Sequence, residues 1–323
     1  MTQILQKHRP SLTIRAGHLA RQLIEKEGLH AQQVDIVPGA AGGPKGIGIQ
    51  GLDQAIFGDF FAQAPQRRTL IGSSIGSWRF ASILAWGAKE GTERLSNLYT
   101  NLSFHKKMSR QEVAHICQGM LIDLIQGQEQ QLVDHPDYHL AVISIKAQHI
   151  FQSDLALPLL ASVAGIIGSN ALGRKHNRLF MQRVISQPSS GQQFKVEDDF
   201  VTHYQSLNRD NAIPWLMASA SIPGVMAAIR DIPDAPKGSY RDGGLIDYHI
   251  DLPFESQGIV LYPHFSDSIT PGWFDKMLKK RKANPENQAR TLLLSPSQDY
   301  LQSLPLGRLP DRKDFTLKGL DQK

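Results

Sequence analysis

The stretch Leu70-Ile71-Gly72-Ser73-Ser74-Ile75-Gly76-Ser77-Trp78 begins as a short apolar run and continues through a turn into a helical pattern. The turn has the form G-x-S-x-G, with Ser74 at its centre. In such a turn the serine lies on strained backbone between a strand and a helix, and small residues at Gly72 and Gly76 let the two elements pass closely. The N-terminus of the following helix offers N–H groups to a negative charge. We therefore predict a nucleophile elbow at Ser74, while an ordinary Gly- and Ser-rich loop remains the alternative.

Around this turn, apolar runs alternate with helical patterns. Residues 34–37 and 69–72 are predicted strands, and residues 45–61 and 75–89 are predicted helices. This βαβα order implies a parallel sheet with helices on its faces, hence the α/β class.

Periodicity and turn signals predict the rest of the chain. The further predicted helices are residues 11–28, two within 92–127 (the second opened by a capping box at Ser109), 211–221 and a basic one at 274–282. The further predicted strands are residues 138–145, 179–185, 258–262 and 291–294. Residues 186–209 are predicted to form a surface loop, and the tail after Leu304 to be poorly ordered.

Residues 155–167 form a mostly apolar run that is too short to span a bilayer. Two structures fit such a run, a helix buried in the core or a wall that binds an acyl chain. A plain core helix is the favoured interpretation.

The composition is that of a globular protein, with 323 residues, 41% hydrophobic and 20% charged. The formal charge of +5 is modest and its basic residues are spread out except in 276–290, so no nucleic-acid partner is predicted. A mildly basic face leaves peripheral contact with an anionic membrane open. Residues 1–15 contain no apolar signal-peptide core, which favours a cytoplasmic protein.

The same composition argues against metal and redox chemistry. Cys117 is the single cysteine, which excludes an internal disulfide and a cysteine-rich zinc site, and its helical context indicates a buried, inert thiol. The sequence contains neither the HExxH nor the EF-hand spacing. We therefore predict no metal site and no cofactor.

The glycine-rich segment Gly39-Ala40-Ala41-Gly42-Gly43-Pro44-Lys45-Gly46-Ile47-Gly48 admits three interpretations. It is not a P-loop, because the Gly-Lys-Ser/Thr ending is absent. The G-x-G-x-x-G match at Gly46–Gly51 falls inside the predicted helix, and no acidic residue ends the next strand to hold a ribose. The third interpretation is an oxyanion hole, in which bare backbone N–H groups stabilise the charge of an acyl-transfer transition state. A simple tight turn is the remaining alternative.

Ser74 also needs a base. A Ser–His–Asp triad would use His249 or His264, but the chain has 12 histidines and their position alone has little weight. The other candidate is Asp242 in Asp242-Gly243-Gly244, where two glycines would let the carboxylate approach another segment closely. An ordinary turn is again the alternative.

Together these blocks resemble the patatin-like phospholipases. The segment Gly42-Gly43-Pro44-Lys45-Gly46 resembles that family's oxyanion loop, residues 72–76 its nucleophile elbow, and Asp242-Gly243-Gly244 its D-G-G motif. The segment Ala218-Ser219-Ala220-Ser221-Ile222-Pro223-Gly224-Val225 resembles the family's Ala/Ser-rich segment before the aspartate.

The resemblance implies a three-layer α/β/α fold with a mainly parallel central sheet and hydrolysis of lipid acyl esters by a Ser–Asp dyad. In this sequence Ser74 would be the nucleophile and Asp242 the base. The N–H groups of Gly42, Gly43 and Lys45 would hold the oxyanion.

The resemblance covers residues 34–255, and we predict one domain, 1–323, with a C-terminal extension at 256–323. Two departures bear on substrate choice, because Ala40-Ala41 replace expected glycine and acidic residues and Lys45 replaces an arginine. Two other functions stay open, a Ser–His–Asp esterase and a catalytically silent relative that binds lipid or a protein.

Overall fold

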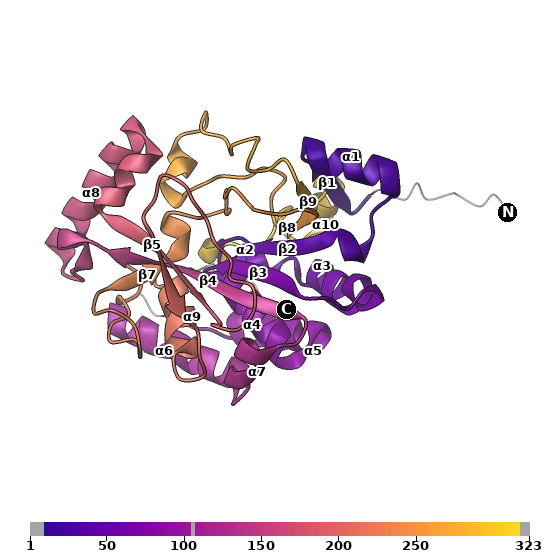
Figure 1. The fold of residues 1–323 in the computed structure, drawn as a ribbon. Coiled ribbons are helices and arrows are strands. Elements are labelled where there is room, and N and C mark those ends of the chain that lie inside the picture. Colours follow the sequence, from indigo (N-terminus) through magenta and orange to yellow (C-terminus); the bar gives the residue numbers. More distant parts are fainter. Residues whose placement is uncertain (1–9, 105–106, 317–323) are drawn as a thin grey trace.

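A nine-stranded sheet runs through the part of the chain that the computed structural model describes, residues 10–104 and 107–316 (Figure 1). Its order is β1-β9-β8-β2-β3-β4-β5-β6, and β7 pairs separately with β4. The strands are β1 (Leu12–Ala16), β2 (Val34–Gly39), β3 (Arg68–Ser73), β4 (Tyr138–Ala147), β5 (Met181–Gln187), β6 (Thr202–Ser206), β7 (Tyr240–Asp242), β8 (Ile259–Pro263) and β9 (Thr291–Pro296).

The central pairs β9–β8, β8–β2, β2–β3 and β3–β4 are all parallel. Antiparallel pairing occurs where β1 joins β9 and where β4 meets β5 and β7. The predicted mainly parallel α/β sheet is therefore confirmed. The segment predicted as a C-terminal extension supplies β8 and β9, so it completes the same sheet.

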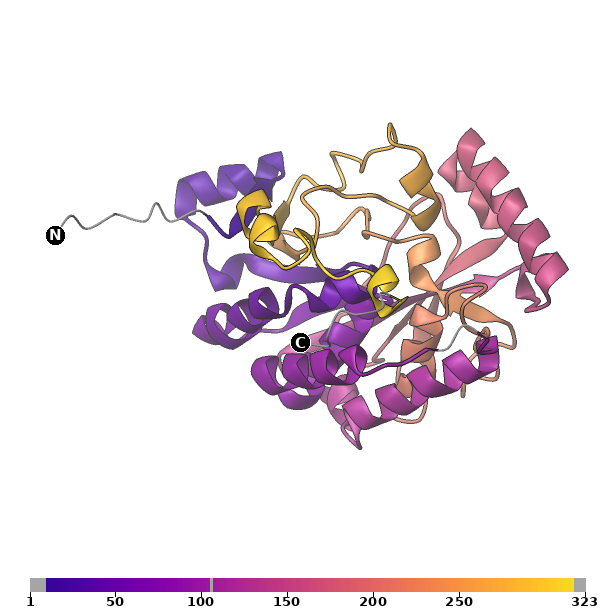
Figure 2. The same ribbon diagram turned by 180° about the vertical axis from the view of Figure 1, so that it is seen from behind.

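Side chains alternate between the two faces of this sheet, as the period of a strand requires. Leu70 points into a core formed with the helices, whereas Ile71 packs on the opposite face among Ile36, Ile143 and Val260. Helices cover the first face: α3 (Gln50–Gln54), α4 (Ile75–Trp86), α5 (Ala88–Thr100), α6 (Arg110–Ile125), α7 (Glu129–Asp134) and α9 (Ala212–Ala220). The other face is covered largely by irregular segments together with α8 (Ala156–Leu172) (Figures 1 and 2).

The middle of the sheet contains a branch that decides the geometry of the site. The last pair between β3 and β4 is Ser73 with Ile143, and the next residue of β4, Ser144, pairs with Asp242 of β7. Since β7 runs antiparallel to β4, β3 and β7 approach each other from opposite directions along the same edge. Their ends, which carry Ser74 and Asp242, therefore meet.

Several predicted helices are shorter or interrupted. The expected helix at 45–61 is wrong, because it breaks into α2 (Pro44–Ile47), α3, a π-helix Ala55–Phe60 and a 3₁₀ turn Phe61–Gln63. The helix expected at 75–89 ends at Trp86, where Gly87 has φ of 78° and α5 starts in a new direction. The capping box at Ser109 is confirmed, since its side chain accepts from the Glu112 N–H at 3.2 Å.

Local patterns mispredict four other places, and in the first two the reason is long-range strand pairing. Residues 11–28 are not one helix, because 12–16 pair with β9 as β1 before α1 (His18–Glu27) begins. The loop expected at 186–209 contains β6, which pairs with β5. The basic helix expected at 274–282 is only a 3₁₀ turn, Trp273–Met277. The tail after Leu304 buries Leu309 and forms a 3₁₀ turn, Arg312–Thr316; residues 317–323 lie outside the described residues.

The apolar run at 155–167 is helical, but the prediction of a core helix is wrong. Only Leu159, Ser162, Ile166 and Asn170 of α8 are buried, and the opposite side of the helix is exposed. Within the described residues, no helix is both long and apolar enough to cross a bilayer. Cys117 is buried as predicted, and burial raises the pKa of its thiol to about 11.

Candidate active site

Ser74 lies between β3 and α4 with φ of 56° and ψ of −127°, a strained conformation for a residue with a side chain. The flanking glycines leave no room for a larger residue. A Cβ on Gly76 would lie 1.9 Å from the Gly39 carbonyl oxygen, and one on Gly72 would lie 2.5 Å from the Ser77 backbone nitrogen. The close passage of strand and helix therefore requires glycine at both positions.

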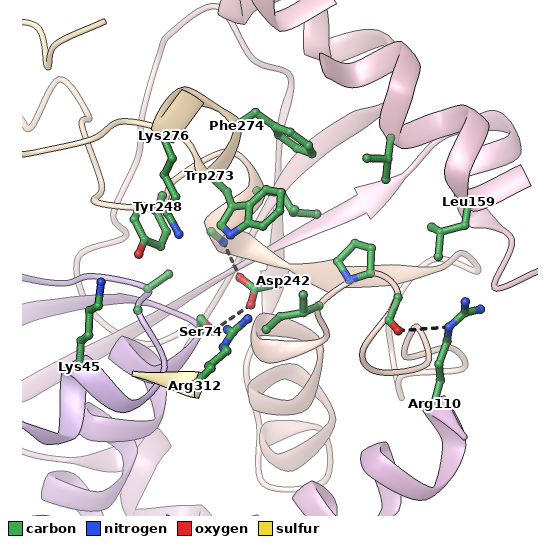
Figure 3. A pocket seen from close by; sticks show the side chains of 18 of the residues that line it. Lys45, Ser74, Arg110, Leu159, Asp242, Tyr248, Trp273, Phe274, Lys276 and Arg312 are labelled. Carbon is green, nitrogen blue, oxygen red and sulfur yellow. Dashed lines mark hydrogen bonds between the residues drawn. The ribbon is translucent and has the colours of Figure 1, made fainter. Parts of the chain in front are cut away.

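Ser74 and Asp242 form a direct hydrogen bond. The Ser74 Oγ donates to Asp242 Oδ2 at 2.9 Å, and both residues are buried (Figure 3). The other carboxylate oxygen, Oδ1, accepts the Gly244 N–H at 2.7 Å. One oxygen is thus fixed by the backbone while the other faces the serine.

The two glycines after Asp242 allow this approach. A Cβ on Gly243 would lie 2.3 Å from the Ile143 carbonyl oxygen, and one on Gly244 would lie 2.7 Å from the Cβ of Ala41. The D-G-G turn is therefore wedged between β4 and the glycine-rich loop.

Burial raises the pKa of Asp242 from its usual 3.8 to about 6. Hydrogen bonds from the Gly244 N–H and the Ser74 hydroxyl oppose this shift, as do the positive charges of Arg312 and Lys276. A carboxyl with this pKa is mostly ionised at pH 7, yet it is a far better proton acceptor than an exposed aspartate.

Ser219 of α9 holds the elbow in place. Its hydroxyl accepts the Ser74 backbone N–H at 2.8 Å and donates to the Ile143 carbonyl oxygen at 2.6 Å. Ser77 adds a hydrogen bond to the Ser74 carbonyl oxygen at 2.7 Å. Ser219 belongs to the Ala/Ser-rich segment noted in the sequence, but no sequence signal indicated this contact.

The glycine-rich loop lies beside the elbow. Gly42 and Lys45 line the same cavity as Ser74, and Gly43, at φ of 58°, precedes Pro44 at the start of α2. The Ala41 N–H donates to the Tyr248 carbonyl oxygen at 2.8 Å. Among the described residues, the N–H groups of Gly42 and Gly43 have no acceptor, and the Lys45 N–H is in a first helical turn, where such groups lack intrahelical partners.

A cavity of about 550 Å³ opens over the Ser74–Asp242 pair (Figure 3). One wall is apolar and includes Leu159, Leu160 and Val163 of α8. Positive side chains also line it: Lys45, Arg110, Lys276 and Arg312.

The cations lie close enough to affect one another. Lys276 Nζ lies 3.7 Å from the centre of the Tyr248 ring, and its pKa is lowered to about 8 by burial and by the charges of Arg312 and Lys45. Lys45 Nζ lies 3.7 Å from Asp311 Oδ2. The cavity therefore offers a positively charged side to a ligand.

A second cavity of about 280 Å³ meets the first at Ser74, Ile222 and Arg312. Its lining is mainly apolar: Ile75, Trp78, Tyr99, Leu102, Phe104, Val113, Cys117, Ala220, Val225 and Met226. The nucleophile candidate thus stands where an apolar cavity and a partly cationic one join.

His249 and His264, the candidates for a triad, are not at this junction. Their rings contact each other with centroids 4.3 Å apart, and burial lowers the pKa of both. The His249 Nδ1 accepts the Thr270 N–H at 3.0 Å. In the ranges that the structure describes, no histidine lines either cavity.

Sequence reasoning missed Arg312, Lys276 and Tyr248 as parts of the site. Arg312 belongs to the tail that was expected to be poorly ordered, and Lys276 to a segment expected to be a basic helix. Neither segment carries a local pattern that points to Ser74, because its position depends on packing over distant strands.

Comparison with protein-family models finds no match to this chain, and comparison with curated proteins finds no significantly similar sequence. In the part of the chain that is described, no group of three His, Cys, Asp or Glu side chains could hold a metal ion.

Proposed function

We propose that this chain is a serine acyl-ester hydrolase related to the patatin-like phospholipases, with Ser74 as the nucleophile and Asp242 as the general base. One observation carries the proposal. A serine on a strained strand-to-helix turn donates a 2.9 Å hydrogen bond to a buried carboxylate. A nucleophile within hydrogen-bond reach of its base is the arrangement that covalent catalysis needs.

The reaction would proceed in two stages. Ser74 Oγ attacks the ester carbonyl carbon while its proton passes to Asp242 Oδ2. The oxyanion then accepts hydrogen bonds from the free N–H groups of Gly42 and Gly43, with the Lys45 N–H as a further donor. Collapse breaks the bond to the alcohol oxygen, which takes the proton from Asp242 and leaves an acyl ester on Ser74.

Water completes the turnover. Asp242 accepts a proton from water as the water oxygen attacks the acyl carbonyl, and the oxyanion forms again in the same place. Collapse releases a carboxylic acid and returns the proton to Ser74 Oγ. No histidine takes part in this scheme.

The two cavities support an acyl ester as the substrate class. The apolar cavity beyond Ile75 and Trp78 suits an acyl chain, since burial of methylene groups is favourable. The cavity with Lys276 and Arg312 suits the alcohol side of the ester, above all one that carries negative charge.

The test is labelling with an alkyl fluorophosphonate, which phosphonylates only an activated serine. We expect the wild-type chain to be labelled, faster with a longer alkyl chain, and Ser74→Ala to lose all labelling. Ser73→Ala is the matched control, because Ser73 is next to Ser74 in the chain but does not line either cavity. Labelling that persists in Ser74→Ala, or a folded wild type that is never labelled, would contradict the proposal.

The pKa of Asp242 predicts how turnover depends on pH. Because the base works only when ionised, kcat/KM should fall about tenfold per unit as pH drops below about 6, and should level off above it. Hydrolysis of a soluble short-chain ester between pH 4.5 and 8 measures this. A midpoint near 4, the value of an exposed aspartate, would show that Asp242 is not the titrating base.

A further inference from the structure

The helix α8 exposes no polar side chain to water. Every exposed residue of α8 is Ala, Leu, Ile or Gly, including Leu157 at 81% and Leu172 at 85% exposure. A helix on the surface of a soluble protein normally presents charged and polar residues to water. We call the exposed side of α8 (Leu157, Leu160, Ala161, Ala164, Ile167, Gly168, Ala171 and Leu172) the outer face.

The polar residues of α8 point inward and have partners there. Ser162 donates to the Pro158 carbonyl oxygen of α8 itself at 2.8 Å, whereas Ser169 donates to Asn177 Oδ1 of the following 3₁₀ turn at 2.7 Å. Asn170 donates to Asp275 Oδ1 at 2.8 Å. Ser169 and Asn170 therefore tie α8 to neighbouring segments on the side opposite the outer face.

Positive charge borders the outer face. The chain from Leu155 to Gln182 contains no acidic residue, and Lys175 and Arg178 are exposed just beyond the end of α8. Arg281 donates to the Asn170 carbonyl oxygen at 2.8 Å, which brings the exposed Lys279, Lys280 and Lys282 to the same end.

The cavity over Ser74 is lined by α8 through Leu159 and Val163, and also through Leu160 of the outer face; Leu159 is labelled in Figure 3. In both overall views α8 lies along one edge of the molecule (Figures 1 and 2). A surface that met the outer face would therefore adjoin the mouth of the candidate active site.

We propose that α8 docks on an anionic phospholipid bilayer, lying in the interface with Leu157 and Leu172 among the acyl chains and the lysines near the head groups. Apolar burial together with attraction of basic residues to anionic lipid is the combination that holds interfacial helices. Docking itself does not depend on the proposed function. Delivery of substrate from the bilayer to Ser74 rests on it.

A fluorescent reporter tests docking directly. Cys117 is buried, so in Leu157→Cys the new thiol is the accessible one and takes an environment-sensitive dye. We expect its emission to rise and shift to the blue with vesicles of phosphatidylcholine and phosphatidylglycerol, and to stay unchanged with phosphatidylcholine alone. The same dye on Ile14→Cys, exposed on the edge strand β1, should not respond. A response at Ile14 equal to that at Leu157, or none at Leu157, would overturn the proposal.

Vesicle sedimentation separates docking from catalysis, and is done in the Ser74→Ala background. Leu157→Glu/Leu172→Glu should bind anionic vesicles at least about tenfold more weakly, and Lys175→Glu/Arg178→Glu about tenfold more weakly. Two controls make the same changes of charge at exposed positions away from α8 and should bind normally. The control for the leucine variant is Ile14→Glu/Ile122→Glu, and the control for the basic variant is Lys89→Glu/Lys237→Glu. Undiminished binding of both α8-side variants would overturn docking.

Two further results complete the test. A wild-type dimer that becomes monomeric in Leu157→Glu/Leu172→Glu would show that a second copy covers the outer face, and would overturn the lipid assignment. Hydrolysis of a soluble ester should be unchanged in that variant, since neither residue lines either of the two cavities at Ser74. Docking without any ester turnover would support α8 as the membrane-docking helix and would overturn only the proposed hydrolase function.

Discussion

Replacement of Asp242 by Asn should lower kcat/KM for ester hydrolysis by about 10²- to 10⁴-fold, the usual contribution of a general base. Asparagine keeps the shape of the side chain, so its oxygen can still accept the Gly244 N–H and its amide can donate to Ser74 Oγ. What it cannot do is take the serine proton. The measurement is steady-state hydrolysis of a soluble acyl ester at pH 7.5.

Stability distinguishes this effect from structural damage. Because the pKa of Asp242 is raised in the folded protein, ionisation of this group costs stability as pH rises from about 4 through about 6. An uncharged Asn escapes that cost, so the thermal midpoint at pH 7 should equal or exceed that of the wild type. Asp123→Asn, at an exposed position of α6, is the control and should change neither kcat/KM nor the thermal midpoint. A large fall in the thermal midpoint of Asp242→Asn would indicate a structural role instead.

Gly76→Ala, unlike Asp242→Asn, should destabilise the fold. The added Cβ would lie 1.9 Å from the Gly39 carbonyl oxygen, a backbone atom of β2 that cannot rotate away. We expect a loss of about 3 kcal/mol or more in the free energy of unfolding. Turnover should fall with it, because relief of the clash would move the Ser74 elbow away from the glycine-rich loop. Urea unfolding followed by circular dichroism measures the first effect.

Gly119→Ala is the matched control for this prediction. Gly119 also lies inside a helix, α6, but a Cβ there would meet nothing within 4 Å. Alanine forms helix better than glycine, so this change should stabilise the protein by up to about 1 kcal/mol. Equal effects of the two substitutions would mean that close packing at Gly76 does not decide stability.

Sequence patterns predicted the centre of the fold better than its borders. The apolar runs at 34–37 and 69–72 are adjacent parallel strands, as predicted. They could be predicted because both faces of these strands are buried, so apolar residues follow one another in the sequence. Residues 12–16 were predicted as helix, since an edge strand with one partner carries little such signal. The exposed side of α8 was likewise unpredictable, because an apolar run does not reveal what covers it.

For the candidate site, the sequence by itself determined which reactive groups are present and which backbone turns carry them. The spacing of Gly72, Ser74 and Gly76 specifies a sharp turn that only small residues permit, and Asp242-Gly243-Gly244 specifies a carboxylate on backbone that others can approach. These are local requirements of steric contact, so they can be read from a few adjacent residues.

Only the tertiary structure decided which groups meet. Ser74 and Asp242 are 168 positions apart, and they come into contact because β3 and β7 end against each other on one edge of β4. This packing also decides that Asp242, and not His249 or His264, contacts Ser74, that Arg312 of the tail lines the cavity and that α8 is exposed. Such contacts arise from the shape and burial of the whole sheet, which no short stretch of sequence contains.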